Sequence, residues 1–347
     1  MKKMKKILVT GGSGFIGSNF IHHILTKENY SIINLDALTY AGNELNNEKY
    51  INDPNYHFVE GNIASEETVQ KIFKNNEIDY LVNFAAESHV DRSIENPFIF
   101  LNTNIIGTYN LLRASQEYSK KNNRFRFLHV STDEVYGSLD AKENPFTEDN
   151  KYAPNSPYSA SKASSDHFVR AWFHTYKLDV ITTNCSNNYG PYQYPEKLIP
   201  LTIMNALKGK NISIYGDGSN IRDWLYVKDH CRAIFKALLD GKSGEVYNIG
   251  GNNEKNNLEV AKLICETLDI VYPISKNRGF PLSIDSYAKL ITFVGDRAGH
   301  DFRYSINSSK ITKDLGWSPK ETFESGIQKT ISWYLSNQKW LDDVADS

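Results

Sequence analysis

Residues 6–17, KILVTGGSGFIG, decide the fold of this chain. The apolar run at 7–9 predicts a short buried strand, and Gly11, Gly14 and Gly17 follow it at three-residue spacing. After them, apolar residues recur with the period of a helix. Three glycines alone are weak evidence of a site, because any tight turn can hold them. Between a strand and a helix, however, this spacing is typical of a loop that binds the pyrophosphate of a dinucleotide.

Each glycine has a physical role in such a loop. Gly11 permits the turn, Gly14 lets the backbone approach the pyrophosphate, and Gly17 lets the helix pack on the sheet. The pyrophosphate would lie on free N–H groups at the positive end of the helix. Asp36 ends the next predicted strand, where a carboxylate can accept hydrogen bonds from an adenosine ribose. Its charge would repel a 2′-phosphate, and residues 37–39 (ALT) supply no arginine, so NAD is favoured over NADP. The alternative is a solvated turn residue.

The first half of the chain alternates predicted strands with helices. Strands are expected at 31–36, 56–63, 80–86 and 125–131, and a helix is expected at 98–118. Near-continuous apolar strands that alternate with helices indicate a parallel sheet covered on both faces, with right-handed crossovers. We therefore expect an α/β fold: a Rossmann-type doubly wound parallel sheet with a smaller C-terminal α/β substrate domain.

The domain boundaries follow from a change of pattern near residue 187. Prolines crowd the next stretch, and only short helical pieces follow. A strand-like piece at 245–249 could return to the first sheet. We assign residues 1–187, with roughly 223–250, to the NAD-binding domain, and 188–222 with 251–347 to the substrate domain.

Composition narrows the function classes. The chain has 347 residues with 39 basic and 41 acidic side chains, so its net charge of −2 does not favour nucleic acid or an anionic membrane surface. Cys185, Cys231 and Cys265 are odd in number and widely spaced, which suggests neither disulfides nor a metal site and fits a reducing compartment. No apolar run approaches the ~20 residues that span a bilayer, and the basic start at 1–6 lacks the apolar segment of a signal peptide. A cytoplasmic protein is expected.

Tyr158 and Lys162 form a candidate catalytic pair. They are four residues apart in SPYSASK, so a helix would place them on one face. A tyrosine has an ordinary pKa of about 10, which a nearby ammonium and a positively charged nicotinamide would both lower. Such a phenolate can take a proton from a hydroxyl while hydride leaves the carbon. The pair alone fits a surface helix equally well, and Tyr272 with Lys276 has the same spacing in irregular surroundings.

The stretch STDEVYG at 131–137 strengthens this interpretation. It follows the strand 125–131, and parallel strands of this kind end at the ligand crevice. Thr132 could hydrogen-bond the same hydroxyl as Tyr158. Asp133 and Glu134 supply adjacent carboxyls, which can divide into acid and base when their surroundings separate the two pKa values. The alternative is a solvated acidic loop.

At this point the sequence resembles the dTDP-glucose 4,6-dehydratase family of extended short-chain dehydrogenases/reductases. The resemblance covers nearly the whole chain. Its triplet Thr-Asp-Glu separates such dehydratases from sugar epimerases, which generally lack the carboxylate pair. The motifs that carry the resemblance are TGGSGFIGS (10–18), DALTYAGN (36–43), AAESHVDRS (85–93), STDEVYG (131–137), YSASK (158–162), NNYGPYQYPEKLIPL (187–201), YGDGSNIRDWLYVKDH (215–230) and DRAGHDFRY (296–304).

The resemblance implies a hydro-lyase with NAD as cofactor. Tyr158 would act as base for oxidation at C4 of the glucose, and Lys162 would hold the nicotinamide ribose. Glu134 would remove the C5 proton, and Asp133 would protonate the departing C6 hydroxyl. Hydride would then return to C6, which gives dTDP-4-keto-6-deoxyglucose. Synthesis of dTDP-rhamnose is the commonest downstream route that the resemblance implies.

The resemblance also assigns binding positions. Departures from the family pattern are Asn62 for aspartate, Ser213 and Ala298 for prolines, and Ser138 for aspartate, and they put base specificity more in question than chemistry. The substrate positions are Ser88, Thr132, Asn187, Lys197, Leu198, Arg222, Asn257, Arg297 and His300. The cofactor positions are Gly11, Gly14, Phe15, Ile16, Gly17, Asp36, Thr39, Asn62, Ile63, Ala85, Ala86, Thr103, Tyr158, Lys162 and Asn188, and no metal is expected.

The sequence leaves alternative functions open. The same fold serves UDP-sugar 4,6-dehydratases and 4-epimerases, and a cofactor-sensing binding protein could keep it without catalysis. Asp133 and Glu134 disfavour the epimerase. The resemblance also implies a homodimer, formed through helices at 98–118 and 158–176 that would make a four-helix bundle.

Overall fold

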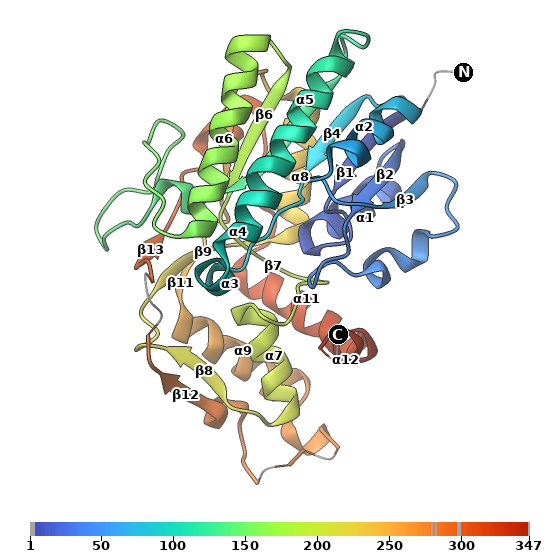
Figure 1. The fold of residues 1–347 in the computed structure, drawn as a ribbon. Coiled ribbons are helices and arrows are strands. Elements are labelled where there is room, and N and C mark those ends of the chain that lie inside the picture. The colour runs from blue at the N-terminus through green and yellow to red at the C-terminus, as the bar shows by residue number, and fades with distance from the viewer. Residues whose placement is uncertain (1–3, 279, 282, 297–299, 346–347) are drawn as a thin grey trace.

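The computed structural model describes residues 4–278, 280–281, 283–296 and 300–345 (Figure 1). It confirms the expected doubly wound α/β fold. The main sheet has seven strands in the order β10-β6-β5-β4-β1-β2-β3, and all its neighbours are parallel. The chain reverses direction across the sheet between β1 and β4, which is where such folds bind ligands. The strands are β1 (Lys5–Thr10), β2 (Tyr30–Asp36), β3 (Tyr56–Glu60), β4 (Tyr80–Asn83), β5 (Arg126–Thr132), β6 (Val180–Cys185) and β10 (Val246–Ile249).

Both faces of the main sheet are covered, as the continuous apolar strands predicted. In β1, Ile7 and Val9 pack into one core and Leu8 into the other, because successive side chains of a strand point to opposite faces. Helices α1 and α8 cover the first face, and α2, α5 and α6 cover the second (Figure 1). These helices are α1 (Phe15–Lys27), α2 (Glu66–Asn75), α5 (Thr108–Ser119), α6 (Pro157–Tyr176) and α8 (Val227–Asp240).

The single helix expected at 98–118 is wrong in detail. The structure has α3 (Val90–Glu95), α4 (Pro97–Phe100), a π-helical segment η2 (Leu101–Gly107) and then α5. Asn104 lies in the π-helical segment, and its buried side chain bonds the backbone of Glu87 in both directions. The Ser165 hydroxyl on α6 donates to the Asn104 carbonyl at 2.6 Å. Tertiary hydrogen bonds therefore hold a wider turn than helical periodicity predicts.

Two expected strands are shorter in the structure. The strand expected at 56–63 ends at Glu60, and that expected at 80–86 ends at Asn83. The residues that follow each of them turn away from the sheet and line a cavity. The strand expected at 245–249 does return to the main sheet, as β10 beside β6.

The second half of the chain builds two small sheets and a separate core. One sheet has the order β11-β9-β13 with β7 also paired to β9, and β12 pairs with β8. Strand β9 (Ile221–Tyr226) crosses the expected domain boundary at 222/223. Helix α10 (Ser309–Leu315), which was assigned to the substrate domain, packs into the core that also contains Ile7 and Val9 of β1. The exact division into two domains therefore stays a prediction. The remaining elements are β7 (Asn187–Tyr189), α7 (Leu198–Lys208), β8 (Ile212–Tyr215), β9 (Ile221–Tyr226), β11 (Glu254–Asn256), α9 (Asn257–Val271), β12 (Ile291–Val294), β13 (Arg303–Tyr304), α10 (Ser309–Leu315), α11 (Phe323–Ser336) and α12 (Gln338–Ala345), with short 3₁₀ segments η1 (Glu44–Tyr50), η3 (Asp133–Tyr136), η4 (Ile274–Lys276) and η5 (Tyr287–Leu290).

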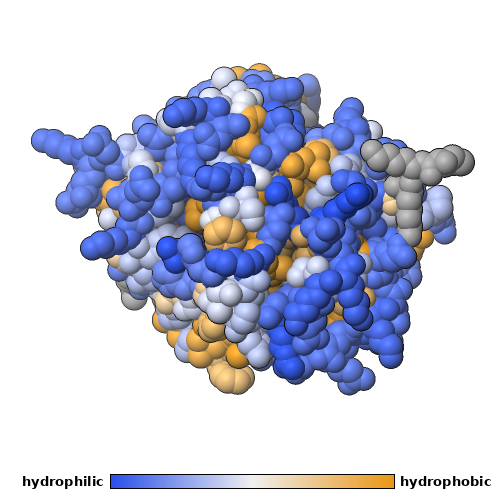
Figure 2. Space-filling view, turned by 90° about the horizontal axis from the view of Figure 1, so that it is seen from above, coloured by the Kyte–Doolittle hydropathy of each residue, from blue (hydrophilic) through white to orange (hydrophobic). Residues whose placement is uncertain are grey.

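The surface fits the balanced composition. The face seen from above is largely hydrophilic, with small hydrophobic patches (Figure 2). Across the described residues, none of the helices has both the length and the apolar character that crossing a membrane requires. All three cysteines are free and buried.

Candidate active site

A cavity of about 500 Å³ lies at the carboxyl ends of the main-sheet strands. Its walls come from the glycine loop after β1, from the ends of β2, β4, β5 and β6, and from helices, strands and loops of the second half of the chain, among them α7, β8 and β9. This volume lies within the range of pockets that bind small molecules. The cavity extends from the glycine loop to the carboxyl pair at 133–134, so a long ligand can reach from one to the other.

The glycine loop has the shape of a phosphate cradle. Gly11 has a φ of +70°, and a Cβ there would lie 2.6 Å from the backbone nitrogen of Ala85. A Cβ on Gly17 would lie 2.2 Å from the Gly11 carbonyl oxygen, so the loop and α1 touch at this point. A Cβ on Gly14, by contrast, would have 3.4 Å to its nearest neighbour and lies at the cavity wall. Because α1 begins just after Gly14, its first N–H groups are placed to receive an anion.

Asp36 is buried at the end of β2 beside this loop. One carboxylate oxygen accepts from the backbone N–H of Ser13 at 2.8 Å, and the other accepts from that of Leu38 at 2.9 Å. Burial raises the pKa of Asp36, and these backbone hydrogen bonds oppose the rise. The carboxylate thus ties β2 to the glycine loop and also lines the cavity. Cradle and carboxylate together fit the pyrophosphate and ribose of NAD.

The structure brings the expected binding residues together. Arg297 lies outside the described residues. Asn62, one of the departures from the family pattern, uses its side-chain oxygen to accept from the backbone N–H of Ala64 at 2.8 Å. Every expected cofactor and substrate position among the described residues, Asn62 included, lines the same cavity. The individual roles of these residues stay predictions.

The carboxyl pair lies where β5 gives way to the 3₁₀ turn η3. Thr132 starts this turn: its hydroxyl accepts from the N–H of Glu134 and donates to Asp133 Oδ1 at 3.4 Å. Asp133 is buried, and its Oδ2 has no hydrogen-bond partner among the described residues. Burial raises the pKa of Asp133 well above its usual range, and the charge of Glu134 adds to the rise. The protonated form of Asp133 is therefore favoured relative to that of an exposed aspartate, which suits the role of an acid.

Tyr158 and Lys162 lie on one face of α6, as predicted. The helix begins at Pro157, and Ser156 caps it in a capping box with Ser159. Lys162 Nζ donates to the carbonyl of Val130 at 2.8 Å. The capping box fixes the start of α6, and Tyr158 and Lys162, on one face of that helix, both line the cavity.

The expected lowering of the Tyr158 pKa is wrong for the chain by itself. Burial raises the pKa of Tyr158 well above its ordinary value, the Glu134 charge adds to the rise, and a hydrogen bond with Thr132 opposes it. Burial also lowers the pKa of Lys162. Burial and the Glu134 carboxylate therefore outweigh the Lys162 ammonium at Tyr158 in the chain alone.

Arg222 is held in place by backbone carbonyls. Its guanidinium donates to the carbonyls of Ile221, Asp301 and Phe302, at 2.7 to 3.2 Å, and lies 4.4 Å from the centre of the Tyr304 ring. Asp223 instead accepts the N–H groups of Gly251 and Asn253 at 2.8 and 2.7 Å. Arg222 therefore lines the cavity in a fixed orientation that suits an anionic group.

Sequence reasoning missed several side chains of the cavity. Glu196 accepts a hydrogen bond from Tyr40 at 3.1 Å, and the guanidinium of Arg92 lies 3.5 Å from the centre of the Tyr40 ring. Tyr304 and Trp224 also line the cavity. Glu196 and Tyr40 are next to Lys197 and Thr39, which the resemblance assigned, but neither the spacing nor the type of these residues marks a chemical role.

The chain belongs to the GDP-mannose 4,6 dehydratase family, whose model matches residues 8–330. It is 54% identical, over 98% of its length and 95% of the relative, to "dTDP-glucose 4,6-dehydratase 1" of Escherichia coli (strain K12). The dTDP-glucose 4,6-dehydratase of Bacillus anthracis, solved in complex with NAD, has a TM-score of 0.84 and 50% identity over 98% of this chain and 99% of that one. DesIV, a dTDP-glucose 4,6-dehydratase of Streptomyces venezuelae with NAD and TYD bound, has a TM-score of 0.88 and 42% identity over 98% and 99%. The resemblance seen in the sequence is confirmed.

Proposed function

We propose that this chain is a dTDP-glucose 4,6-dehydratase, a hydro-lyase that removes water across C5 and C6 of the sugar. The observation that carries the proposal is the carboxyl pair Asp133 and Glu134 beside Tyr158, in a cavity that also holds a dinucleotide cradle. The relative that is 54% identical over nearly the full length supports the same activity. An epimerase of this fold would not need two carboxyls, and so the pair favours elimination.

NAD is the cofactor that the cradle fits. Gly11, Gly14 and Gly17 would face its pyrophosphate and Asp36 its adenosine ribose, while Lys162 would hold the nicotinamide ribose. When bound, NAD supplies a hydride acceptor for C4 and a hydride donor for C6. The described part of the chain contains no group of His, Cys, Asp and Glu side chains suited to a metal ion.

Tyr158 takes the proton from the C4 hydroxyl of the sugar. Thr132 hydrogen-bonds Tyr158, and so both can contact that hydroxyl at once. A phenol with a raised pKa seldom ionises, so little phenolate is present to act as a base until positive charge arrives nearby. Proton removal at C4 is therefore tied to a cofactor and a lysine that carry positive charge.

Glu134 and Asp133 divide the elimination between them. Glu134 takes the C5 proton, which a ketone at C4 makes acidic, and Asp133 gives a proton to the departing C6 hydroxyl. Burial raises the pKa of Asp133 and so favours the protonated form that a general acid needs. The unpartnered Asp133 Oδ2 is the oxygen from which this proton can leave toward a substrate.

The nucleotide end of the substrate would lie against the second half of the chain. Arg222 is held in place by three backbone carbonyls, and its guanidinium fork suits the diphosphate. Lys197 donates to the Ser88 carbonyl at 3.0 Å, which joins two further substrate positions. The other residues proposed for substrate binding are Thr132, Asn187, Leu198, Asn257 and His300, all at the cavity wall.

We also propose that the protein is a homodimer in the cytoplasm. Phe98, Ile99, Leu101 and Ile106, on α4 and η2, are 70%, 43%, 49% and 46% exposed, which is unusual for large apolar side chains so close together in the chain. A second copy packed through this segment and α6 would cover them. Free, buried cysteines support a reducing compartment. Sedimentation of the wild type against Phe98→Asp tests the dimer, since a charge in that contact would give monomers.

The activity test is direct. The protein is incubated with dTDP-glucose or UDP-glucose, and the product is followed by the alkaline absorbance of a 4-keto sugar and by mass for loss of water. We expect product from dTDP-glucose and much less from UDP-glucose. A 4-epimer of unchanged mass would establish an epimerase instead, and an unchanged substrate that still binds would establish a binding protein.

A further inference from the structure

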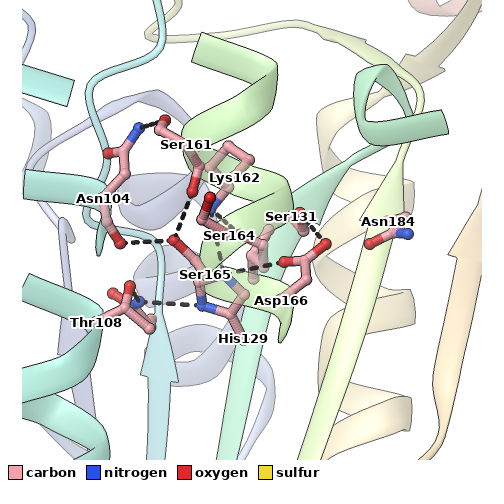
Figure 3. A network of polar contacts seen from close by, with 12 residues as sticks. Asn104, Thr108, His129, Ser131, Ser161, Lys162, Ser164, Ser165, Asp166 and Asn184 are labelled. Atoms are coloured by element: carbon pink, nitrogen blue, oxygen red, sulfur yellow. Dashed lines mark hydrogen bonds and ion pairs between the residues drawn. The ribbon is translucent and has the colours of Figure 1, made fainter. Parts of the chain in front are cut away.

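A buried polar network surrounds Lys162, and Lys162 and Ser131 of this network also line the cavity (Figure 3). Lys162 and Asp166 are one turn apart on α6, so their side chains extend from the same face of the helix toward β5. His129 of β5 lies between them: its Nε2 is 3.4 Å from Lys162 Nζ and 3.4 Å from Asp166 Oδ1. All three side chains are at most 4% exposed. None of the catalytic steps proposed above uses His129 or Asp166.

Hydrogen bonds fix which nitrogen of His129 carries the proton. Thr10 donates to Asn83 Oδ1 at 2.6 Å, which leaves the Asn83 amide NH₂ facing His129 Nδ1 at 3.1 Å. His129 Nδ1 is therefore an acceptor. Burial lowers the pKa of His129 to about 4, so the ring is neutral at pH 7 and has its proton on Nε2. That N–H faces the Asp166 carboxylate.

Asp166 is buried among hydrogen-bond donors from other elements. Its Oδ2 accepts hydrogen bonds from Ser131 at 2.9 Å and from Tyr152 at 3.0 Å, while Oδ1 faces His129. The two hydroxyl donors on Oδ2 fix the orientation of the Asp166 side chain. A buried charge of this kind is costly unless it has an opposite charge nearby, and the buried cation one turn away is Lys162.

We propose that Asp166 is a positioning residue for Lys162: its buried carboxylate, one turn away on α6 and beside the His129 ring, keeps the Lys162 side chain charged while Lys162 donates to the Val130 carbonyl of β5. This proposal rests on the function proposed above only in the role given to Lys162. A lysine in a dry site tends to lose its proton, and a neutral amine would neither bind a ribose as firmly nor favour a Tyr158 phenolate. The network therefore sets the charge of Lys162, and the action of Tyr158 as a base depends on that charge.

Other titratable groups also face Lys162 and enter the test. Burial lowers the pKa of Lys162, and Asp166 and then Cys185 oppose this. The groups that face it or Tyr158 are His129 from β5, Cys185 from β6, Tyr158 and Asp166 from α6, and Asp133 and Glu134 from η3. Of these, Asp166 is the carboxylate whose charge acts on Lys162 most strongly.

The test measures the Lys162 charge directly. Protein with ¹³C-labelled lysine is titrated by NMR, and the Lys162 signal is assigned by its loss in Lys162→Arg. We expect Lys162 to be charged at pH 7 in the wild type, and to titrate about 1–3 pH units lower in Asp166→Asn. Tyr152→Phe is the matched control, because it removes a hydrogen bond to Asp166 and leaves the charge.

Three results would overturn the proposal. They are a neutral Lys162 at pH 7 in the wild type, a titration that Asp166→Asn leaves unchanged, and an equal shift in Tyr152→Phe, which would make the network merely structural. The wild-type measurement stands even if Asp166→Asn does not fold. If the proposed dehydratase activity is present, its alkaline limb should move to lower pH in Asp166→Asn. Absent activity with the expected NMR titration would count against the proposed function alone.

Discussion

The Asp36 carboxylate at the end of β2 accepts a hydrogen bond at 2.8 Å from the backbone N–H of Ser13, in the loop that follows β1. One side chain thus joins the cofactor's expected ribose site to the expected pyrophosphate site. The contact makes Asp36 both a binding residue and part of the loop's own structure. Substitutions at Asp36 must therefore separate these two contributions.

Asp36→Ala should weaken NAD binding about 10–100-fold, since hydrogen bonds to charged groups contribute about 1.5–3 kcal/mol. Asp36→Asn keeps an acceptor for the Ser13 N–H but loses the charge that repels a 2′-phosphate. It should therefore keep a folded loop while narrowing the preference for NAD over NADP. Calorimetric titration with both dinucleotides measures this. Equal NAD affinity in wild type and Asp36→Ala would remove Asp36 from the site.

Gly14→Ala and Gly17→Ala should fail for different reasons. A Cβ on Gly14 has room in the chain itself but would fill the cradle, so the variant should melt like the wild type and lose NAD binding. A Cβ on Gly17 meets a backbone oxygen at 2.2 Å, and we expect a loss of stability of about 1–3 kcal/mol or more. Thermal melting with and without NAD distinguishes the two. Normal NAD affinity in Gly14→Ala would contradict the cradle.

Tyr158→Phe keeps the ring and removes the proton acceptor. NAD should still bind, and turnover of dTDP-glucose should fall by about 10²–10⁴, the usual contribution of a positioned acid or base. Steady-state kinetics together with NAD titration make the measurement. Near-normal turnover would show that Tyr158 is only structural.

Glu134→Gln should separate oxidation from elimination. Glutamine has nearly the same shape but cannot take the C5 proton, while Tyr158 and Lys162 are untouched. Elimination should slow by about 10²–10⁴, and the near-ultraviolet absorbance of reduced nicotinamide should rise without 6-deoxy product. Normal product formation would mean that the carboxyl pair is not catalytic. If both signals disappear, Glu134 positions the substrate and another group is the base.

Asp133→Asn should stabilise the protein while it abolishes elimination. The folded chain holds the Asp133 proton more tightly than the unfolded chain does, so stability falls as pH rises from the unfolded pKa through the raised folded pKa. Asparagine removes this penalty. At pH 7 we expect a gain of about 1–3 kcal/mol in the free energy of unfolding, which shrinks toward pH 4. Denaturant melts at both pH values check it. A variant less stable than the wild type at pH 7 would show that the Asp133 carboxyl contributes to folding.

Local sequence predicted most of what positions the site. Strand, glycine loop and helix at 6–17 are predicted from neighbours in the chain, and β10 was predicted because the strand-like stretch at 245–249 precedes two glycines. The π-helical turn at η2 could not be predicted this way, since it is held by hydrogen bonds that join its Asn104 to Glu87 and Ser165, which lie elsewhere in the chain. The raised pKa of Tyr158 was missed for a related reason: burial and the Glu134 charge depend on tertiary packing. Glu196 and Tyr40 are 156 residues apart, and no periodicity connects them.

Strand β10 has a consequence for how the protein is made. The main sheet receives this edge strand from residues 246–249, only after the chain has left it to build β7, α7, β8 and β9. During synthesis the ribosome therefore releases most of the sheet with the β6 edge still bare. Exposed strand edges attract other chains. A nascent chain halted before residue 246 should be bound by chaperones or aggregate, and swapping the sugar-binding half between relatives requires several crossover points rather than one.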